Sequence, residues 1–237
     1  MNLLGIVQSL HYEAKLAGDA PTTVLLQTGR AADLVRWCIE AYNDIQREQD
    51  GKWKWLRGEW YFDTVAATPS YAYTAVYDLT DVALISRFRA WDLDEREPPM
   101  IYLSADGEVT QRDLEIWDWP SFRHQYVRAT HTAAYSGTIA VKVDDKLFLG
   151  ATPDDVYRVT GTYWKSNQEL AEDTDIPEMP ANYHMAIVYR AIVKYGYDSV
   201  SPEALARAEA DGAPIMEALA LNQAYSRFSW SMAGALA

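Results

Sequence analysis

The feature that most constrains this chain is a change in the spacing of its apolar residues, from helical at both ends to strand-like in the middle. Near the start, Leu3, Ile6, Val7 and Leu10 recur at the spacing that places side chains on one face of a helix. Between residues 52 and 165 the chain is instead rich in aromatic and β-branched residues. The change predicts an α+β fold, with a β-rich region inserted between two helical ends.

Two helices are expected at the N-terminal end. The first should occupy residues 3–16, with Asn2 as its N-cap and Gly18 ending it. The second should occupy residues 29–49, because apolar residues recur along one face while charged residues lie largely outside it. Its apolar stripe is expected to comprise the following residues: Ala31, Leu34, Val35, Cys38, Tyr42 and Ile45.

Two further helices are expected near the C-terminus. Residues 181–195 have a strongly helical pattern, and Gly196 is expected to end that helix. The next helix should extend over residues 202–227, following a serine N-cap and a proline at the first helical position. Gly212 and Pro214 are expected to kink or split it.

The domain organisation follows from these elements. Helices that each carry an apolar stripe need a shared core, so residues 1–51 and 181–227 are expected to form one helical bundle. Residues 52–165 are expected to form a β-rich domain, a sheet or sandwich. Residues 166–180 have the composition of an acidic linker with prolines, and residues 228–237 form an apolar C-terminal tail.

Within the β-rich domain, turn signals divide the chain into short strands. Residues 70–77 are expected to pair with residues 59–65, across a turn at Thr68-Pro69. Asp144-Asp145 predicts a tight hairpin turn between two strands. The other elements expected are strands over residues 84–91, 138–143, 146–149 and 156–164, and a short helix beginning at Trp119-Pro120.

Charge and hydropathy exclude several classes of function. The net charge of −13 gives an acidic surface that repels DNA phosphate, so tight nucleic-acid binding is not expected. No apolar run approaches the roughly 18–20 residues of a membrane-spanning helix. Because the N-terminal segment lacks a basic stretch and Gln8 interrupts its apolar residues, it is not typical of a signal peptide. The protein is expected to fold in the cytoplasm where it is made.

The usual residues of catalysis and metal binding form no recognisable motif. The four histidines His11, His124, His131 and His184 have no catalytic or metal-ligand spacing, and the single cysteine, Cys38, is expected to be a buried apolar residue. We therefore expect no catalytic residue, no metal and no cofactor. Two acidic pairs lack the glycine and glutamate of a calcium-binding loop and are interpreted as solvated turns: Asp144/Asp145 and Asp173/Asp175.

Aromatic residues are unusually abundant, with nine Trp and 16 Tyr. Such residues build cores and protein interfaces, but a Trp beside a carboxylate is also a common feature of carbohydrate sites. A carbohydrate-binding or carbohydrate-cleaving module is therefore the alternative to a structural role, since paired carboxylates can hydrolyse glycosides. The sets that would serve it are Glu59/Trp60, Trp91/Asp92 and Trp117/Asp118/Trp119.

Four groups of short motifs carry a resemblance to a known family. Most lie near the predicted helices and the last strands, and they cover roughly residues 1–62 and 138–196. With these motifs, the chain resembles the head-to-tail adaptor (connector) proteins of tailed bacteriophages. The four groups of motifs comprise residues 27–29, 34–37 and 41–46; residues 53–57; residues 149–154, 157–163 and 168–170; and residues 175–180, 184–191 and 194–196.

The resemblance implies a structural virion protein of the neck rather than an enzyme, assembled in the host cytoplasm. It implies a ring, a dodecamer, that binds beneath the portal protein, contacts a tail or nozzle protein and lets DNA pass through its lumen without specific binding. The apolar C-terminal tail has little core to join, so we interpret it as a docking peptide for the portal. Its anchors are expected to be Tyr225, Phe228, Trp230 and Met232.

Overall fold

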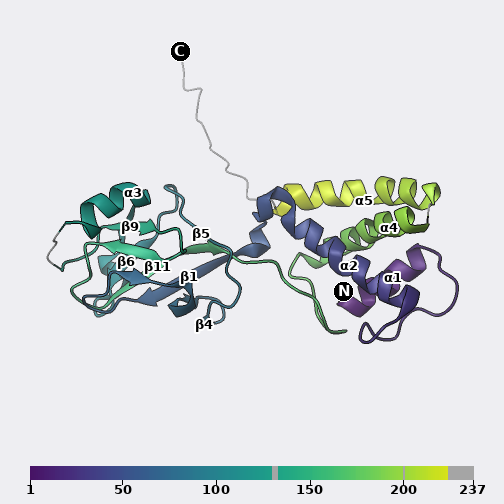
Figure 1. Cartoon of the computed structure of the whole chain (residues 1–237), viewed down its shortest axis with the longest axis horizontal. Helices are drawn as coiled ribbons and strands as arrows, with labels where there is room; N and C mark the ends of the chain where they lie inside the picture. Colours follow the sequence, from purple (N-terminus) through teal and green to yellow (C-terminus); the bar gives the residue numbers. More distant parts are fainter. Residues whose placement is uncertain (130–132, 200, 224–237) are drawn as a thin grey trace, which may run out of the picture. The chain divides into compact units, whose positions relative to one another are not determined.

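A computed structural model of the chain describes residues 1–129, 133–199 and 201–223 (Figure 1). The chain divides into two compact units. The helical unit comprises Met1–Leu56 and Asn167–Ala237, and the β-rich unit comprises Arg57–Ser166. Helices at both ends and sheets in the middle confirm the α+β prediction. Within the described ranges, no helix is long and apolar enough to cross a membrane.

The helical unit is built from four main helices. Asn2 caps the first of them, since its side-chain oxygen accepts a hydrogen bond from the Gly5 amide at 3.0 Å, as the sequence predicted. The helices are α1 (Leu3–Glu13), α2 (Gly29–Arg47), α4 (Met185–Ser199) and α5 (Pro202–Gln223), with short 3-10 turns η1 (Glu48–Gly51), η2 (Lys54–Leu56) and η6 (Ala181–Tyr183).

Buried residues of all four helices belong to one hydrophobic cluster. Ile6, Cys38 and Ile187 are completely buried within it, and Leu219 brings in α5. The expected stripe of α2 needs correction at two positions, because Ala31 and Val35 are only partly buried. The buried face turns instead toward the following residues of α2: Leu34, Trp37, Cys38, Ala41, Tyr42 and Ile45.

Two glycines that were expected to end or break helices do neither. Helix α4 continues past Gly196 to Ser199, and α5 runs as one helix through Gly212 and Pro214. A side chain at residue 196 would lie 2.8 Å from Leu205, and one at residue 212 would lie 2.9 Å from Tyr189. The two glycines therefore permit α4 and α5 to approach closely, and the prediction of a split at residues 212–214 was wrong.

Residues 167–180, where we expected an acidic linker, belong to the helical unit. Leu170 and Met179 are buried in its core, at 4% and 1% exposure. Asp173 accepts hydrogen bonds from the Val24 amide at 2.5 Å and from the Thr23 hydroxyl at 2.8 Å. The acidic residues of this segment thus hold backbone in place, and the segment is an ordered arm of the unit rather than a free connection.

The β-rich unit contains two sheets. The larger has the order β4-β3-β1-β11-β6-β7, with β5 also paired to β11, and the smaller has the order β2-β10-β9-β8. Of these pairs only β8 and β9 are parallel. The strands are β1 (Arg57–Asp63), β2 (Ser70–Tyr71), β3 (Tyr77–Asp78), β4 (Ala83–Leu84), β5 (Ala90–Asp92), β6 (Met100–Leu103), β7 (Arg112–Asp113), β8 (Glu115–Ile116), β9 (Thr138–Val141), β10 (Leu147–Gly150) and β11 (Tyr157–Trp164).

Several strands differ from expectation. The segment over residues 70–77 divides, because β3 pairs with β1 while β2 pairs with β10 in the other sheet. The strand expected over residues 84–91 was wrong, since β4 and β5 are separate and pair with different partners. By contrast, the β9–β10 hairpin, the strand β11 and the short helix α3 (Trp119–Phe122) are confirmed.

Candidate functional site

The four side chains predicted to dock on a partner, Tyr225, Phe228, Trp230 and Met232, lie outside the residues that the structure describes. The described candidates are therefore the polar cluster at the start of β1, the aromatic–carboxylate sets and the exposed apolar surfaces.

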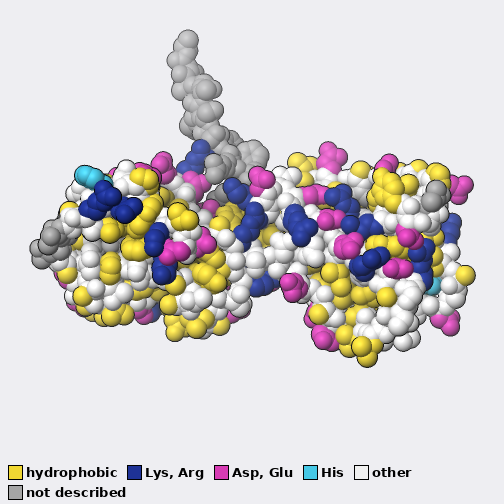
Figure 2. Space-filling model, in the orientation of Figure 1, with side chains coloured by type: hydrophobic (Ala, Val, Ile, Leu, Met, Phe, Trp, Pro, Cys, Tyr) yellow, Lys and Arg dark blue, Asp and Glu magenta, His cyan; other side chains and the backbone are white. Residues whose placement is uncertain are grey.

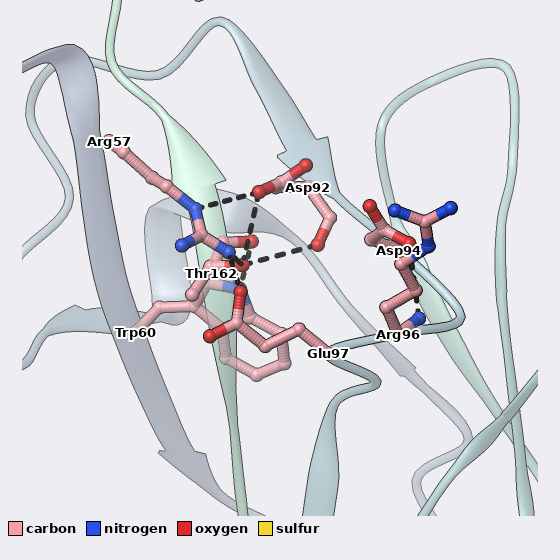
Figure 3. Close-up of polar contacts among 7 residues, drawn as sticks. All are labelled: Arg57, Trp60, Asp92, Asp94, Arg96, Glu97 and Thr162. Atoms are coloured by element: carbon pink, nitrogen blue, oxygen red, sulfur yellow. Dashed lines mark hydrogen bonds and ion pairs between the residues drawn. The ribbon is translucent and has the colours of Figure 1, made fainter. Parts of the chain in front are cut away.

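A polar cluster surrounds Arg57, the first residue of β1 (Figure 3). Its Nε donates to Oδ2 of Asp92 at 2.8 Å, and its Nη2 donates to the Glu97 carboxylate and to Oγ1 of Thr162 at 3.1 Å. The side chains of Arg57 and Asp92 are only 18% and 15% exposed. One guanidinium therefore joins β1 to β5, to β11 and to the loop that follows β5.

The charges of this cluster are mutually satisfied. Burial opposes the charge on Arg57, but hydrogen bonds to Glu97 and Asp92 outweigh that effect, so the pKa of Arg57 is raised above its ordinary value. Two carboxylates held by one guanidinium are poorly placed to act as a general acid and a general base. The cluster is suited to fixing the loop over residues 93–99 against the sheet.

Two of the proposed carbohydrate platforms are part of the β-rich core. Trp60 is completely buried, stacks on Phe62 and meets Trp91 edge to face at 5.3 Å between ring centroids. The indole nitrogens are engaged too: that of Trp60 donates to the Thr162 carbonyl at 2.9 Å, and that of Trp91 to the Asp145 carbonyl at 2.6 Å. Neither ring offers a free face to a sugar, and Glu59 points away to solvent.

The third set, Trp117/Asp118/Trp119, lies at the start of helix α3. Asp118 caps α3 by accepting a hydrogen bond from the Ser121 amide at 3.1 Å, and this bond lowers the pKa of the carboxyl group. A carboxyl group that is kept ionised is unsuited to protonating a leaving group. Trp119 packs against Phe148, with ring centroids 4.9 Å apart. Asp118 and Trp119 are thus both engaged in local structure, and neither supports the carbohydrate alternative.

The other chemically interesting residues are also structural. No group of three or more His, Cys, Asp or Glu side chains within the described ranges could hold a metal ion. Cys38 is buried, and burial raises the pKa of its thiol well above the ordinary value. His184 is buried, with Nε2 hydrogen-bonded to the Met179 carbonyl at 2.9 Å, and burial lowers its pKa. His131 lies outside the described residues.

The sequence reasoning missed an exposed apolar surface on the hairpin formed by β3 and β4. Tyr77, Leu79, Val82 and Leu84 are 40%, 45%, 66% and 51% exposed. Strand β4 is an edge of the larger sheet, and Figure 2 shows hydrophobic side chains gathered over this part of the β-rich unit. The sequence placed Leu84 in a longer strand, so only the observed topology reveals the surface.

The helical unit has two apolar grooves of its own. One lies between α4 and α5 and is lined by Tyr189, Val193 and Met216, with Arg190 and Glu209 among its polar residues. The other lies beside α2 and includes the following residues: Val24, Leu26, Val35 and Ile39. Leu26 is fully exposed. Exposed apolar surfaces of this kind are typical of proteins that bind other proteins.

Comparison with known proteins gives one clear relationship. A family model described as SU10 adaptor protein matches residues 1–234, which include both units. A search of curated proteins found no match.

Proposed function

The chain belongs to the SU10 adaptor protein family, and from this premise we propose that it is the head-to-tail adaptor of a tailed bacteriophage. In this role it forms a ring between the portal and the tail, and DNA passes through the lumen of the ring. Its partners are the portal protein, further copies of itself in a dodecamer, and a tail or nozzle protein. It acts in the neck of the virion after assembly in the host cytoplasm.

One observation carries this proposal: the family relationship extends over both the helical and the β-rich unit, so it supports an adaptor role for both units. The surfaces of the two units support it. A ring needs a heterologous contact, in which two different surfaces of each subunit meet. The β3–β4 hairpin and the grooves of the helical unit offer apolar surfaces of the kind that such contacts bury.

The charge of the chain supports the passage of DNA. With 34 acidic and 21 basic residues, the subunit carries a net negative charge, which repels phosphate. A net negative charge disfavours retention of a DNA backbone, which proteins bind through basic residues. DNA could therefore move through the lumen without adhering to it.

The direct test is assembly with portal protein. Mixing the full-length chain with purified portal rings should give a complex of far higher mass than either the subunit or the portal alone, measured by sedimentation velocity. The protein should release no sugar from host surface polysaccharide. Hydrolysis that disappears when Glu59 or Asp118 is replaced, without any portal complex, would overturn the proposal in favour of a glycosidase.

A further inference from the structure

The longest stretch of this acidic chain without an acidic residue lies in the β-rich unit. Residues 119–143 include Arg123, Arg128 and Lys142 but neither Asp nor Glu, in a protein of net charge −13. The first part of the stretch forms α3 and the following helical turn η5 (Arg123–Val127). Figure 2 shows Lys, Arg and His side chains gathered at the α3 end of the β-rich unit.

Arg123, His124 and Arg128, which together we call the basic surface, are exposed. Neither arginine forms an ion pair with any residue that the structure describes, whereas Arg36 and the partly exposed Arg158 each pair with an aspartate of the same unit. Unpaired arginines grouped on an acidic protein are typical of a surface that meets a negatively charged partner.

A complementary surface lies on the helical unit. Residues 167–180 contain no Lys or Arg, and we call this segment the acidic arm. Glu169 and Glu172 are exposed on it and form no ion pair with a described residue. Their backbone is held in place, because Oδ2 of Asp175 accepts hydrogen bonds from the amides of Ala171 and Glu172 at 2.7 and 2.8 Å.

We propose that the basic surface of one subunit binds the acidic arm of the adjacent subunit in the ring. The inference rests on the proposed function, because a closed ring requires each copy to carry two different and complementary surfaces. The two segments meet this requirement, since each has exposed unpaired charge of a single sign. The arm is also held firmly on its unit, so little conformational entropy is lost when it is bound.

A second copy fits the basic surface better than a nucleic acid does. Two arginines and a histidine neutralise few phosphates, and each phosphate contact contributes only a modest, salt-sensitive part of the binding energy. The remaining surface of the chain repels a polyanion. A neighbouring subunit presents carboxylates in a fixed position, and the ring repeats the contact at every interface.

Two variants of the full-length protein test the contact. Arg123→Glu with Arg128→Glu reverses the basic surface, and Glu169→Arg with Glu172→Arg reverses the acidic arm. Each variant alone places like charges at every interface. An equimolar mixture restores opposite charges, because each reversed surface then meets a reversed partner in an alternating ring. All four residues are exposed and outside the cores, so both variants should keep the wild-type circular dichroism and melting temperature.

Self-association would be measured by sedimentation velocity, for the free protein and in the presence of portal rings. Each variant alone should associate at least about tenfold more weakly than the wild type, and the equimolar mixture should associate about as strongly as the wild type. Wild-type association should weaken between about 50 mM and 500 mM salt, because the contact is ionic.

The outcomes separate this inference from the proposed function. A wild type that forms rings while both variants do so equally well overturns the contact but leaves the adaptor role intact. A mixture that fails to recover likewise overturns it. A wild type that never assembles, with or without portal, overturns both proposals. Loss of binding to short duplex DNA in the Arg123/Arg128 variant, with unchanged assembly, assigns the basic surface to nucleic acid instead.

Discussion

The indole ring of Trp60 in β1 lies over Gly161, its register partner in β11, so closely that a side chain at residue 161 would come within 2.5 Å of the ring. Trp60 is completely buried and its nitrogen is hydrogen-bonded to Thr162, so the ring has no free space into which to move. The absence of a side chain at residue 161 is therefore what allows the Trp60 ring to fit into the β-rich core.

Replacing Gly161 by alanine should overpack this core. We expect the free energy of unfolding to fall by about 1–3 kcal/mol, measured by urea denaturation. Gly137→Ala is a matched control, because nothing lies within 4 Å of a side chain added there. If the two substitutions have the same effect on stability, the close approach of Trp60 is not the constraint.

Ile187 and Val35 of the helical unit differ in burial, so replacing each by alanine should lower the free energy of unfolding by different amounts. Ile187 is completely buried, so Ile187→Ala should cost about 2–4 kcal/mol through lost burial and a residual cavity. Val35 lines a surface groove and is only partly buried, so Val35→Ala should cost about 1 kcal/mol or less. Urea denaturation of both variants checks the difference, and equal losses would contradict the observed orientation of α2.

Removing Arg57 from its polar cluster should lower the stability of the protein, because a partly buried carboxylate loses its partner. Arg57→Ala leaves the Asp92 carboxylate, only 15% exposed, without its main partner. We expect a loss of about 1–3 kcal/mol in the free energy of unfolding. Arg36→Ala breaks an exposed pair with Asp33 and should change stability by about 0.5 kcal/mol at most. An Arg57→Ala loss no larger than this control would show that the cluster is fully solvated.

Stability at acid pH should depend on the contact between Tyr163 and Asp78. Burial raises the pKa of Asp78, but the Tyr163 hydroxyl, which donates to its Oδ2 at 2.5 Å, and other partners outweigh burial and lower the pKa below the ordinary 3.8. The folded state therefore binds fewer protons than the unfolded state near this pH. The contribution is complete above about pH 5 and is lost as the pH falls through the folded pKa.

Tyr163→Phe removes the hydroxyl and leaves burial less opposed, so the acid-side loss of stability should move to higher pH. Urea denaturation between pH 3 and pH 7 measures this shift. Tyr77→Phe is the control, since Tyr77 is 40% exposed and precedes Asp78 on the same strand, β3. Parallel pH profiles for wild type and Tyr163→Phe would contradict the role of this hydrogen bond.

Removing the C-terminal tail tests the proposed portal anchor. Deleting residues 228–237 should leave the melting temperature almost unchanged, because the buried residues of the two hydrophobic clusters described lie between Leu3 and Leu219. Portal binding should be lost, since aromatic anchors in pockets each contribute roughly 2–4 kcal/mol and a ring multiplies the loss. Full occupancy of portal rings by the truncated protein would place the contact on the helical unit instead.

Much of this fold could be predicted from local patterns. The helical spacing near both ends, the Asn2 cap and the alternation over β11 each depend on residues close together in the chain. Such features form wherever their few neighbours favour them, which is why the α+β class and the β9–β10 hairpin were predicted correctly. The motifs that resemble phage adaptors are local in the same sense.

The tertiary structure decided what depends on residues far apart in the sequence. Glycine is a residue type that commonly ends helices. Gly196 and Gly212 instead allow α4 and α5 to pack closely, because Leu205 and Tyr189 lie opposite them. The sequence left open a role for Trp60 in binding sugar, and the structure shows instead that residues of β5 and β11 contact its ring. A residue type states which contacts a side chain can make. The contacts that the side chain makes in the folded protein depend on which distant residues pack against it. The spacing of apolar residues along the chain carries no information about these distant residues.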